Sequence, residues 1–269
     1  MPDPSRPGRL LVVMAHPDDE SFACGGTIAR VSDQGHEVTL VCATRGGAGT
    51  PLPGTVGDAG SARRALVAQR ERELQRAAAV LGIRRVELLG YRDGFLTWTP
   101  PGTLDREIAS VIQDVRPDAL LTFGPDGMYW HPDHIAIWER TTAAVRQANA
   151  PGPAVYHVVI PPGTVEGLLA DVRALTPAAE ERLWDIPSRA FGILAPAPTL
   201  AIDVTAAIDR KLAALRAHAS QVGPSHPLAH IDRASALRWL GYEYFHLAAD
   251  SPSPRSFLDD FASPASQCG

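Results

Sequence analysis

Short apolar runs alternate along the chain with longer segments whose apolar residues repeat at helical spacing, and this alternation constrains the fold most. Several runs are almost continuous in Val, Leu, Ile and Ala, which is typical of strands buried on both faces. Strands and helices in alternation predict parallel strands joined by right-handed crossovers. We therefore expect an α/β fold in which helices cover both faces of a mostly parallel sheet.

The boundaries of these elements follow from the apolar runs and from Gly and Pro. The expected strands are Arg9–Ala15, Glu37–Ala43, Arg85–Leu89, Ala119–Phe123, Tyr156–Ile160 and Thr199–Val204. The expected helices are Gly26–Gln34, Ala62–Leu81, Asp105–Val115, His131–Ala148 and Ala206–Ser220. Together they predict one three-layer, Rossmann-like domain over residues 8–250. Residues 251–269 are rich in Ser and Pro, and we expect a flexible tail there.

Charge and cysteine content exclude several partners and locations. The 269 residues carry a net charge of −5 without a basic stripe, which argues against nucleic acid. No apolar run approaches the roughly 20 residues that span a bilayer, and no signal peptide is recognised at the N-terminus. Three cysteines, without a CxxC pair, indicate a reducing cytoplasm. We expect a small-molecule partner; a homo-oligomer stays open.

The first candidate site segment follows the first expected strand and reads His16-Pro17-Asp18-Asp19-Glu20. In open parallel sheets, ligands bind beyond the carboxyl ends of the strands. One imidazole and three carboxylates in five positions would repel phosphate, but they suit a divalent cation. The alternative is a solvated acidic turn that caps the next helix, since Asp is favourable there. That alternative leaves the histidine unexplained.

The second segment follows the fourth expected strand and contains His131-Pro132-Asp133-His134. Near one helical turn, His131 and His134 can face the same side, although both could equally be ordinary residues at a helix start. Both segments follow strands of one sheet, so they should meet at one edge. One His and one Asp from the first segment with one His from the second supply three N/O ligands. Catalytic zinc uses three protein ligands and leaves a position for water.

Motifs over most of the chain resemble the PIG-L/LmbE-like family of zinc-dependent N-deacetylases. They are HPDDESFACGGTIA, Thr44-Arg45-Gly46, QRERELQRAAAVLG, LLGYRDG, PDGMYWHPDH and KLAALRAHASQ. By position, the resemblance implies one Zn²⁺ per chain held by His16, Asp19 and His134, although Fe²⁺ or Co²⁺ would fit similar ligands. It further implies that Asp18 is the general base, that His131 is a second catalytic histidine, and that Asp133 tunes His131.

The resemblance also implies substrate contacts. Arg70 and Asp93 match residues that contact sugar hydroxyls, and Tyr129 matches the family's tyrosine near the second segment. Trp130 stands where the family often has Gly, and we expect its indole to narrow the pocket or stack on a sugar. Gly47 stands where many members are acidic, which leaves the accepted leaving group open.

The expected reaction is removal of an N-acyl group, most simply acetyl, from an amino-sugar compound. Asp18 would take a proton from the activated water, and His131 as imidazolium would stabilise the oxyanion. Either of the two could protonate the departing amine. The rivals are an amidase that cleaves a thiol or other conjugate of an amino sugar and a non-catalytic Mg²⁺-binding protein. Residues 46–60, rich in Gly, are expected to form a lid over the substrate.

Overall fold

The computed structural model describes residues 6–51, 58–148, 152–180 and 182–263. In this part of the chain, a seven-stranded sheet has the order β3-β2-β1-β4-β5-β9-β8. The pairs among β1 to β5 are parallel, whereas β9 runs antiparallel to both of its neighbours. The expected mostly parallel sheet is thus confirmed. The strands are β1 (Arg9–Met14), β2 (Glu37–Thr44), β3 (Arg85–Tyr91), β4 (Ala119–Thr122), β5 (Ala154–Val159), β8 (Leu200–Asp203) and β9 (Tyr242–Leu247).

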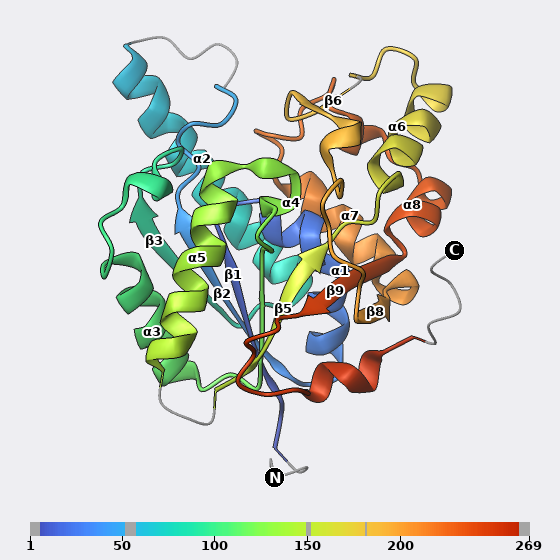
Figure 1. Ribbon diagram of the computed structural model, residues 1–269. Helices are drawn as coiled ribbons and strands as arrows, with labels where there is room; N and C mark the ends of the chain where they lie inside the picture. The colour runs from blue at the N-terminus through green and yellow to red at the C-terminus, as the bar shows by residue number, and fades with distance from the viewer. Residues whose placement is uncertain (1–5, 52–57, 149–151, 181, 264–269) are drawn as a thin grey trace.

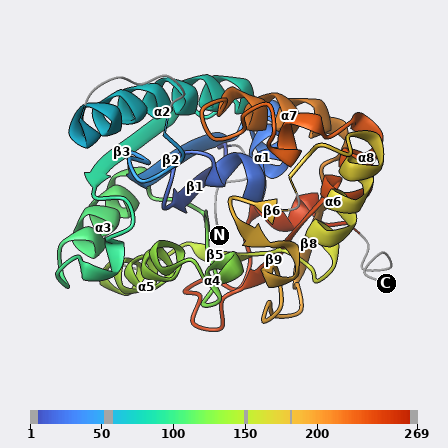
Figure 2. The ribbon, with the colours of Figure 1, turned by 90° about the horizontal axis from the view of Figure 1, so that it is seen from above.

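Helices cover both faces of this sheet (Figures 1 and 2). On one face lie α1 (Asp19–Asp33), α2 (Ala59–Leu81) and α7 (Ile208–Ala217), which pack on one another. On the other lie α3 (Leu104–Val115) and α5 (Pro132–Gln147), which also pack together. Near β9, α6 (Thr164–Leu175) packs on α8 (Arg233–Leu240). Shorter elements are η1 (Leu96–Trp98), α4 (Gly127–Trp130), the hairpin of β6 (Arg182–Leu183) and β7 (Ile186–Pro187), η2 (Ser188–Ala190), η3 (Thr205–Ala207), η4 (Pro227–His230) and η5 (Phe257–Phe261).

The centre of the core is β1, whose residues from Leu10 onward have no exposed surface. Burial of such apolar side chains is the main favourable contribution to folding. In register, Leu10 lies beside Ala119 and Val12 beside Leu121, so β1 and β4 end next to each other. The chain segments that leave these two strands therefore begin side by side, at the upper edge of the sheet in Figure 1.

Helix α1 departs from the expectation, since it begins at Asp19 and not at Gly26. It is kinked at Cys24, whose φ of −148° is not helical. Beyond the kink, the Glu243 carboxylate accepts the amides of Gly26 and Thr27 at 2.8 and 2.7 Å and caps the second half of the helix. Lys211 forms a buried ion pair with the same carboxylate. Glu243 lies on β9, a strand that the sequence reading did not include.

Part of the segment expected to be a flexible tail is packed against the domain. Ser256 and Asp259 form a capping box at the start of η5, and Leu258 and Phe261 are buried. Burial of Leu258 and Phe261 stabilises this packing, although the surrounding segment is rich in Ser and Pro. Residues 264–269 of the expected tail lie outside the described residues.

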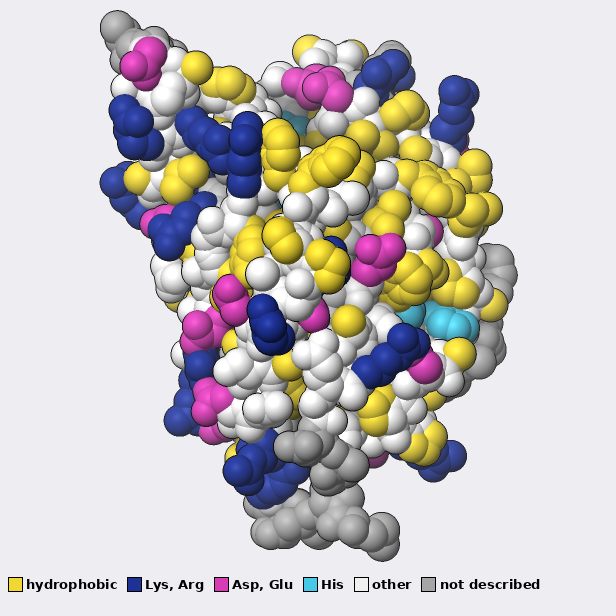
Figure 3. Space-filling model, turned by 60° about the vertical axis from the view of Figure 1, so that its left-hand side comes forward, with side chains coloured by type: hydrophobic (Ala, Val, Ile, Leu, Met, Phe, Trp, Pro, Cys, Tyr) yellow, Lys and Arg dark blue, Asp and Glu magenta, His cyan; other side chains and the backbone are white. Residues whose placement is uncertain are grey.

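Figure 3 shows one face of the molecule, on which Lys and Arg are interspersed with Asp and Glu. In the described part of the chain, every helix is too short or too polar to cross a bilayer.

Candidate metal centre and active site

Three side chains from the two expected segments converge at the carboxyl edge of the sheet. His134 Nε2 lies 3.3 Å from His16 Nδ1 and 3.3 Å from Asp19 Oδ1. His16 Nδ1 lies 3.5 Å from Asp19 Oδ2. Bonds of about 2.0–2.1 Å in a tetrahedron place ligand atoms about 3.3–3.4 Å apart. The distances between the three groups are close to this spacing, with Oδ1 of Asp19 facing His134 and Oδ2 facing His16.

The hydrogen bonds around the two imidazoles turn lone pairs toward this point. His134 Nδ1 donates to the carbonyl of Gly127 at 3.1 Å, and its Nε2 faces His16 and Asp19. His16 Nε2 lies 3.2 Å from Asp93 and 3.3 Å from Asp133, which leaves Nδ1 free to face Asp19. Two nitrogen lone pairs beside a buried carboxylate repel one another unless a positive charge lies between them. The arrangement thus calls for a cation.

The surrounding carboxylates act in the same direction. Burial lowers the pKa of His16, but hydrogen bonds to Asp133, Asp19 and Asp93 outweigh burial and raise that pKa well above its usual value. Burial raises the pKa of Asp19, yet His134 and His16 hold it well below its usual value. The centre therefore stabilises positive charge, whether a proton or a metal ion supplies it.

Asp93 and Asp133 are second partners of His16, and each is held by backbone amides. Asp93 accepts from Ala48 N at 2.8 Å, and Asp133 accepts from the amides of Gly94 and Leu96 at 2.7 and 3.0 Å. Carboxylates that accept the second N–H of a ligating histidine fix its tautomer and orientation. With one ligand atom from each residue, two triplets among the described residues lie within 4.8 Å of one another, namely His16 with His131 and His134, and His16 with Asp93 and Asp133. We favour His16, Asp19 and His134, because His16 Nδ1 and His134 Nε2 lie 3.3 Å apart and each faces an oxygen of Asp19.

A tight turn before α5 sets the position of His134. Gly127 has φ of 55°, and a Cβ there would lie 2.8 Å from Ile135 Cγ1, so glycine is required where its carbonyl orients His134. The Phe123 ring stacks on His134 with a centroid distance of 3.9 Å and an interplanar angle of 5°. Both contacts restrict the imidazole to one orientation. Pro132 occupies the first turn of α5, where its missing N–H has no cost.

Asp18 lies beside the three converging groups with a strained backbone. Its φ of 124° is unfavourable for a residue with a Cβ, and such strain occurs where surrounding contacts impose it. Arg70 donates to its carboxylate at 3.0 Å and also to the carbonyls of Pro17 and Gly46. Burial raises the pKa of Asp18 to about 6, and the Arg70 guanidinium opposes this rise. A carboxylate with a pKa near neutrality is suited to general base catalysis.

His131 differs from its expected charged state. Its pKa is lowered to about 4, mainly by burial and then by His134 and His16, and the opposing effect of Asp133 is weaker. The reason is that the Asp133 carboxylate is directed at His16 and at two backbone amides, whereas only the Asp133 amide reaches His131, at 3.2 Å from Nδ1. With Nδ1 as acceptor, neutral His131 carries its proton on Nε2.

A cavity of about 280 Å³ opens beside these groups. Among the expected residues, its lining includes His16, Asp18, Asp19, Arg70, Asp93, Tyr129 and His131. Trp130 is not part of the described lining, and 47% of its surface is exposed; its backbone has a φ of 68°. Ala48 and Gly49 of the expected lid line the cavity, whereas residues 52–57 of that lid lie outside the described residues.

Sequence reasoning missed part of the cavity wall and a buried polar cluster. Phe22, Met128, Trp184 and Ile186 supply an apolar wall, and only their position after folding could reveal it. His218, in the family-like segment after α7, is fully buried and bonds Glu20. Ser21, His218 and Glu20 are no nucleophilic triad, because Ser21 and Glu20 both lie at Nε2 and all three lack solvent access. Gln221, by contrast, does line the cavity.

Comparisons with known proteins agree with this fold and site. The family model described as PIG-L, GlcNAc-PI de-N-acetylase, matches residues 11–145. The 1D-myo-inositol 2-acetamido-2-deoxy-alpha-D-glucopyranoside deacetylase of Nakamurella multipartita is 37% identical, with 92% of each chain covered. The conserved protein TT1542 of Thermus thermophilus has a TM-score of 0.59 at 26% identity, with 92% of this chain and 96% of that chain covered.

A likeness in fold also extends to an enzyme of a different kind. GalB, the 4-carboxy-2-hydroxymuconate hydratase of Pseudomonas putida, has a TM-score of 0.62 at 22% identity, with 92% of this chain and 97% of that chain covered. Fold alone therefore does not select the reaction. The fold, the His/Asp site and the curated relatives together define an enzyme of the deacetylase class. The chain belongs to the PIG-L family, as the sequence motifs indicated.

Proposed function

We propose that the protein is a zinc-dependent deacetylase that hydrolyses the N-acetyl group of an amino sugar within a small polar molecule. The observation that carries the proposal is the spacing of His16 Nδ1, His134 Nε2 and the Asp19 carboxylate, 3.3–3.5 Å apart beside Asp18. The substrate class draws on the relatives, whose names specify an acetamido sugar on inositol. The donor set favours zinc over magnesium, because Mg²⁺ prefers oxygen ligands.

The metal ligands, the general base and Arg70 have separate roles in this proposal. Zinc held by His16, Asp19 and His134 would lower the pKa of a bound water to about 7 and polarise the amide carbonyl. Asp18 accepts the proton of the attacking water, and its pKa of about 6 leaves it mostly ionised at neutral pH. Arg70 holds the Asp18 carboxylate in place through its 3.0 Å contact.

His131 acts in this proposal as a neutral hydrogen-bond donor. Its pKa of about 4 leaves the ring uncharged at neutral pH. The Asp133 amide donates to Nδ1, so the ring proton lies on Nε2. That N–H stabilises the negative charge that develops on the carbonyl oxygen. Asp18, protonated in the first step, is then the group that returns a proton to the departing amine. This reverses the sequence-based preference for an imidazolium at this position.

Zinc content and acetate release test the function together. The purified enzyme should bind about one zinc per chain and release acetate from N-acetylglucosaminyl-inositol. Chelation should abolish the release, and added zinc should restore it. Activity only on thiol conjugates of the amino sugar would support the amidase alternative. A protein that takes up Mg²⁺ but no transition metal would refute the proposal.

The remaining sequence-based expectations stay proposals. We infer a single domain over residues 8–250, supported by a sheet whose strands extend from Arg9 to Leu247. We infer a cytoplasmic location, supported by Cys24 and Cys42, which are free and buried. Size-exclusion chromatography with light scattering would test whether a homo-oligomer forms.

A further inference from the structure

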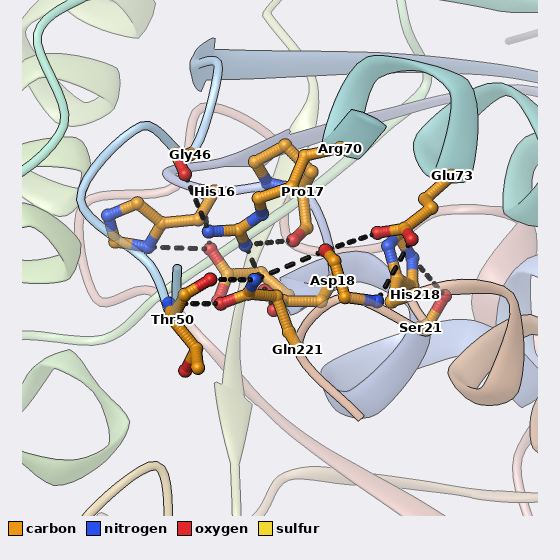
Figure 4. Close-up of polar contacts among 12 residues, drawn as sticks. His16, Pro17, Asp18, Ser21, Gly46, Thr50, Arg70, Glu73, His218 and Gln221 are labelled. Carbon is orange, nitrogen blue, oxygen red and sulfur yellow. Dashed lines mark hydrogen bonds and ion pairs between the residues drawn. The ribbon is translucent and has the colours of Figure 1, made fainter. Parts of the chain in front are cut away.

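Residues 218–221, which we call the 218–221 turn, follow α7 and lie about two hundred positions from the first site segment. His218 is fully buried, and its Nε2 lies 2.8 Å from Glu20 Oε1. Ser21 Oγ donates to the same oxygen at 2.6 Å. Figure 4 shows His218 and Ser21 meeting beside Asp18. Two donors thus fix one oxygen of a carboxylate that has no access to solvent.

The other oxygen of Glu20 reaches the general base. Glu20 Oε2 accepts the backbone N–H of Asp18 at 3.0 Å. Asp18 is the residue with the strained φ of 124°, and a strained backbone persists only when its surroundings over-determine it. His218 therefore fixes Glu20, and Glu20 fixes the peptide from which the Asp18 carboxylate projects.

The same turn also bonds to α2, the helix that carries Arg70. Ser220 donates to Glu73 through its amide at 2.9 Å and through its hydroxyl at 2.6 Å. Glu73 is fully buried on α2, one turn after Arg70, whose guanidinium lies 3.0 Å from Asp18 Oδ2. The turn thus reaches the Asp18 backbone through Glu20 and bonds to the helix from which Arg70 contacts the Asp18 carboxylate.

We propose that His218 is a positioning residue for the general base and acts through Glu20 on the Asp18 peptide. The inference rests on the proposed function. His218 is not in the described lining of the cavity, and its hydrogen bonds go to Glu20 and Ser21 and not to Asp18 itself. The competing explanation is a buried ion pair that contributes only to folding. The two explanations differ in what the loss of His218 does to turnover at constant zinc content.

The test compares two substitutions and a control. His218→Leu removes the donor to Glu20, whereas the amide of His218→Gln can replace Nε2. We expect His218→Leu to lower kcat about 10- to 100-fold, because small displacements of a catalytic group have effects of that size. KM and zinc content should stay near the wild-type values, and His218→Gln should regain most of the turnover. His157→Leu, which removes another buried imidazole whose Nε2 has no partner, should keep wild-type turnover.

A double variant separates positioning from a general loss of structure. If His218 acts through Asp18, then adding His218→Leu to Asp18→Ala should change the residual kcat by less than about twofold, since residues that act as a unit are non-additive. A full independent loss in that background would overturn the inference, as would wild-type turnover of His218→Leu or loss of its zinc. If His218→Leu does not fold, His218→Asn takes its place. Its polar side chain is shorter than that of His218→Gln, so we expect the same loss of turnover as for His218→Leu.

One measurement needs no substrate. A crystal structure of the zinc-bound His218→Leu variant should show the Asp18 carboxylate displaced from Arg70, and an unmoved Asp18 contradicts the inference. Wild-type enzyme that releases no acetate from any N-acetylated amino sugar contradicts the proposed function instead. The two failures are therefore distinguishable.

Discussion

Replacement of Arg70 by Met should shift the pH dependence of the reaction. The Arg70 guanidinium lies 3.0 Å from the Asp18 carboxylate and lowers its pKa against the effect of burial, which leaves that pKa at about 6. An adjacent Arg lowers the pKa of an Asp by about 1 to 3. Asp18 must be ionised to accept a proton, so activity is lost as pH falls through its pKa. Without Arg70, this loss should begin at higher pH.

The size of the effect follows from the ionised fraction. With a pKa of about 6, Asp18 is about nine-tenths ionised at pH 7. A rise of about 2 leaves about one-tenth ionised, which lowers kcat/KM at pH 7 about tenfold and lets it recover by about pH 9. A bound cation lowers the pKa of Asp18 in both proteins, so the difference between them is the quantity to measure.

Acetate release measured from pH 5 to about pH 9 gives the acidic limb of kcat/KM for each protein. Arg70→Lys is the matched control, because it keeps the positive charge and loses the planar fork, so its limb should stay near that of the wild type. The unfolding temperature of each variant shows how much stability is lost with the Arg70 hydrogen bonds to the carbonyls of Pro17 and Gly46. A loss in Arg70→Met that is uniform over all pH values would show that the charge does not act on the base.

Three further predictions concern the base, the metal and the fold. Asp18→Ala should keep its zinc and lose about 10²- to 10⁴-fold in kcat, measured by acetate release; loss of zinc instead would make Asp18 a ligand. His134→Ala should lose zinc affinity in a chelator competition, and a fully metallated, active variant would exclude the ligand role. Lys211→Met leaves the buried Glu243 charge unpaired and should lower the free energy of unfolding by about 3–5 kcal/mol in urea titrations. A loss below about 1 kcal/mol would mean that Glu243 is satisfied by its backbone amides alone.

The first half of the fold was predictable because its signals are local. The strands β1 and β2 begin at the expected Arg9 and Glu37, and α2 ends at the expected Leu81, where Gly82 adopts φ of 78°. Apolar runs and a C-terminal glycine carry this information without reference to the rest of the chain. The same holds for the convergence of the two site segments, which follows from parallel strands ending at one edge.

The second half depends on contacts between distant segments. β9 inserts between β5 and β8 in antiparallel orientation, a pairing that no local pattern specifies. Glu243 looks like a solvent-facing residue of an alternating strand, but it is buried as the cap of α1. In the same way, the charge of His131 depends on burial and on where the Asp133 carboxylate points, and sequence spacing gives neither.

The cap that Glu243 provides limits how far the chain can be shortened from its C-terminal side. The family match ends at residue 145, and every ligand candidate lies within it. Yet the helix that begins at Asp19 is interrupted at Cys24, and its second half depends on a carboxylate about a hundred residues beyond that match. Shortened versions that keep only the matched region would retain the recognisable motifs without the strand that completes their helix.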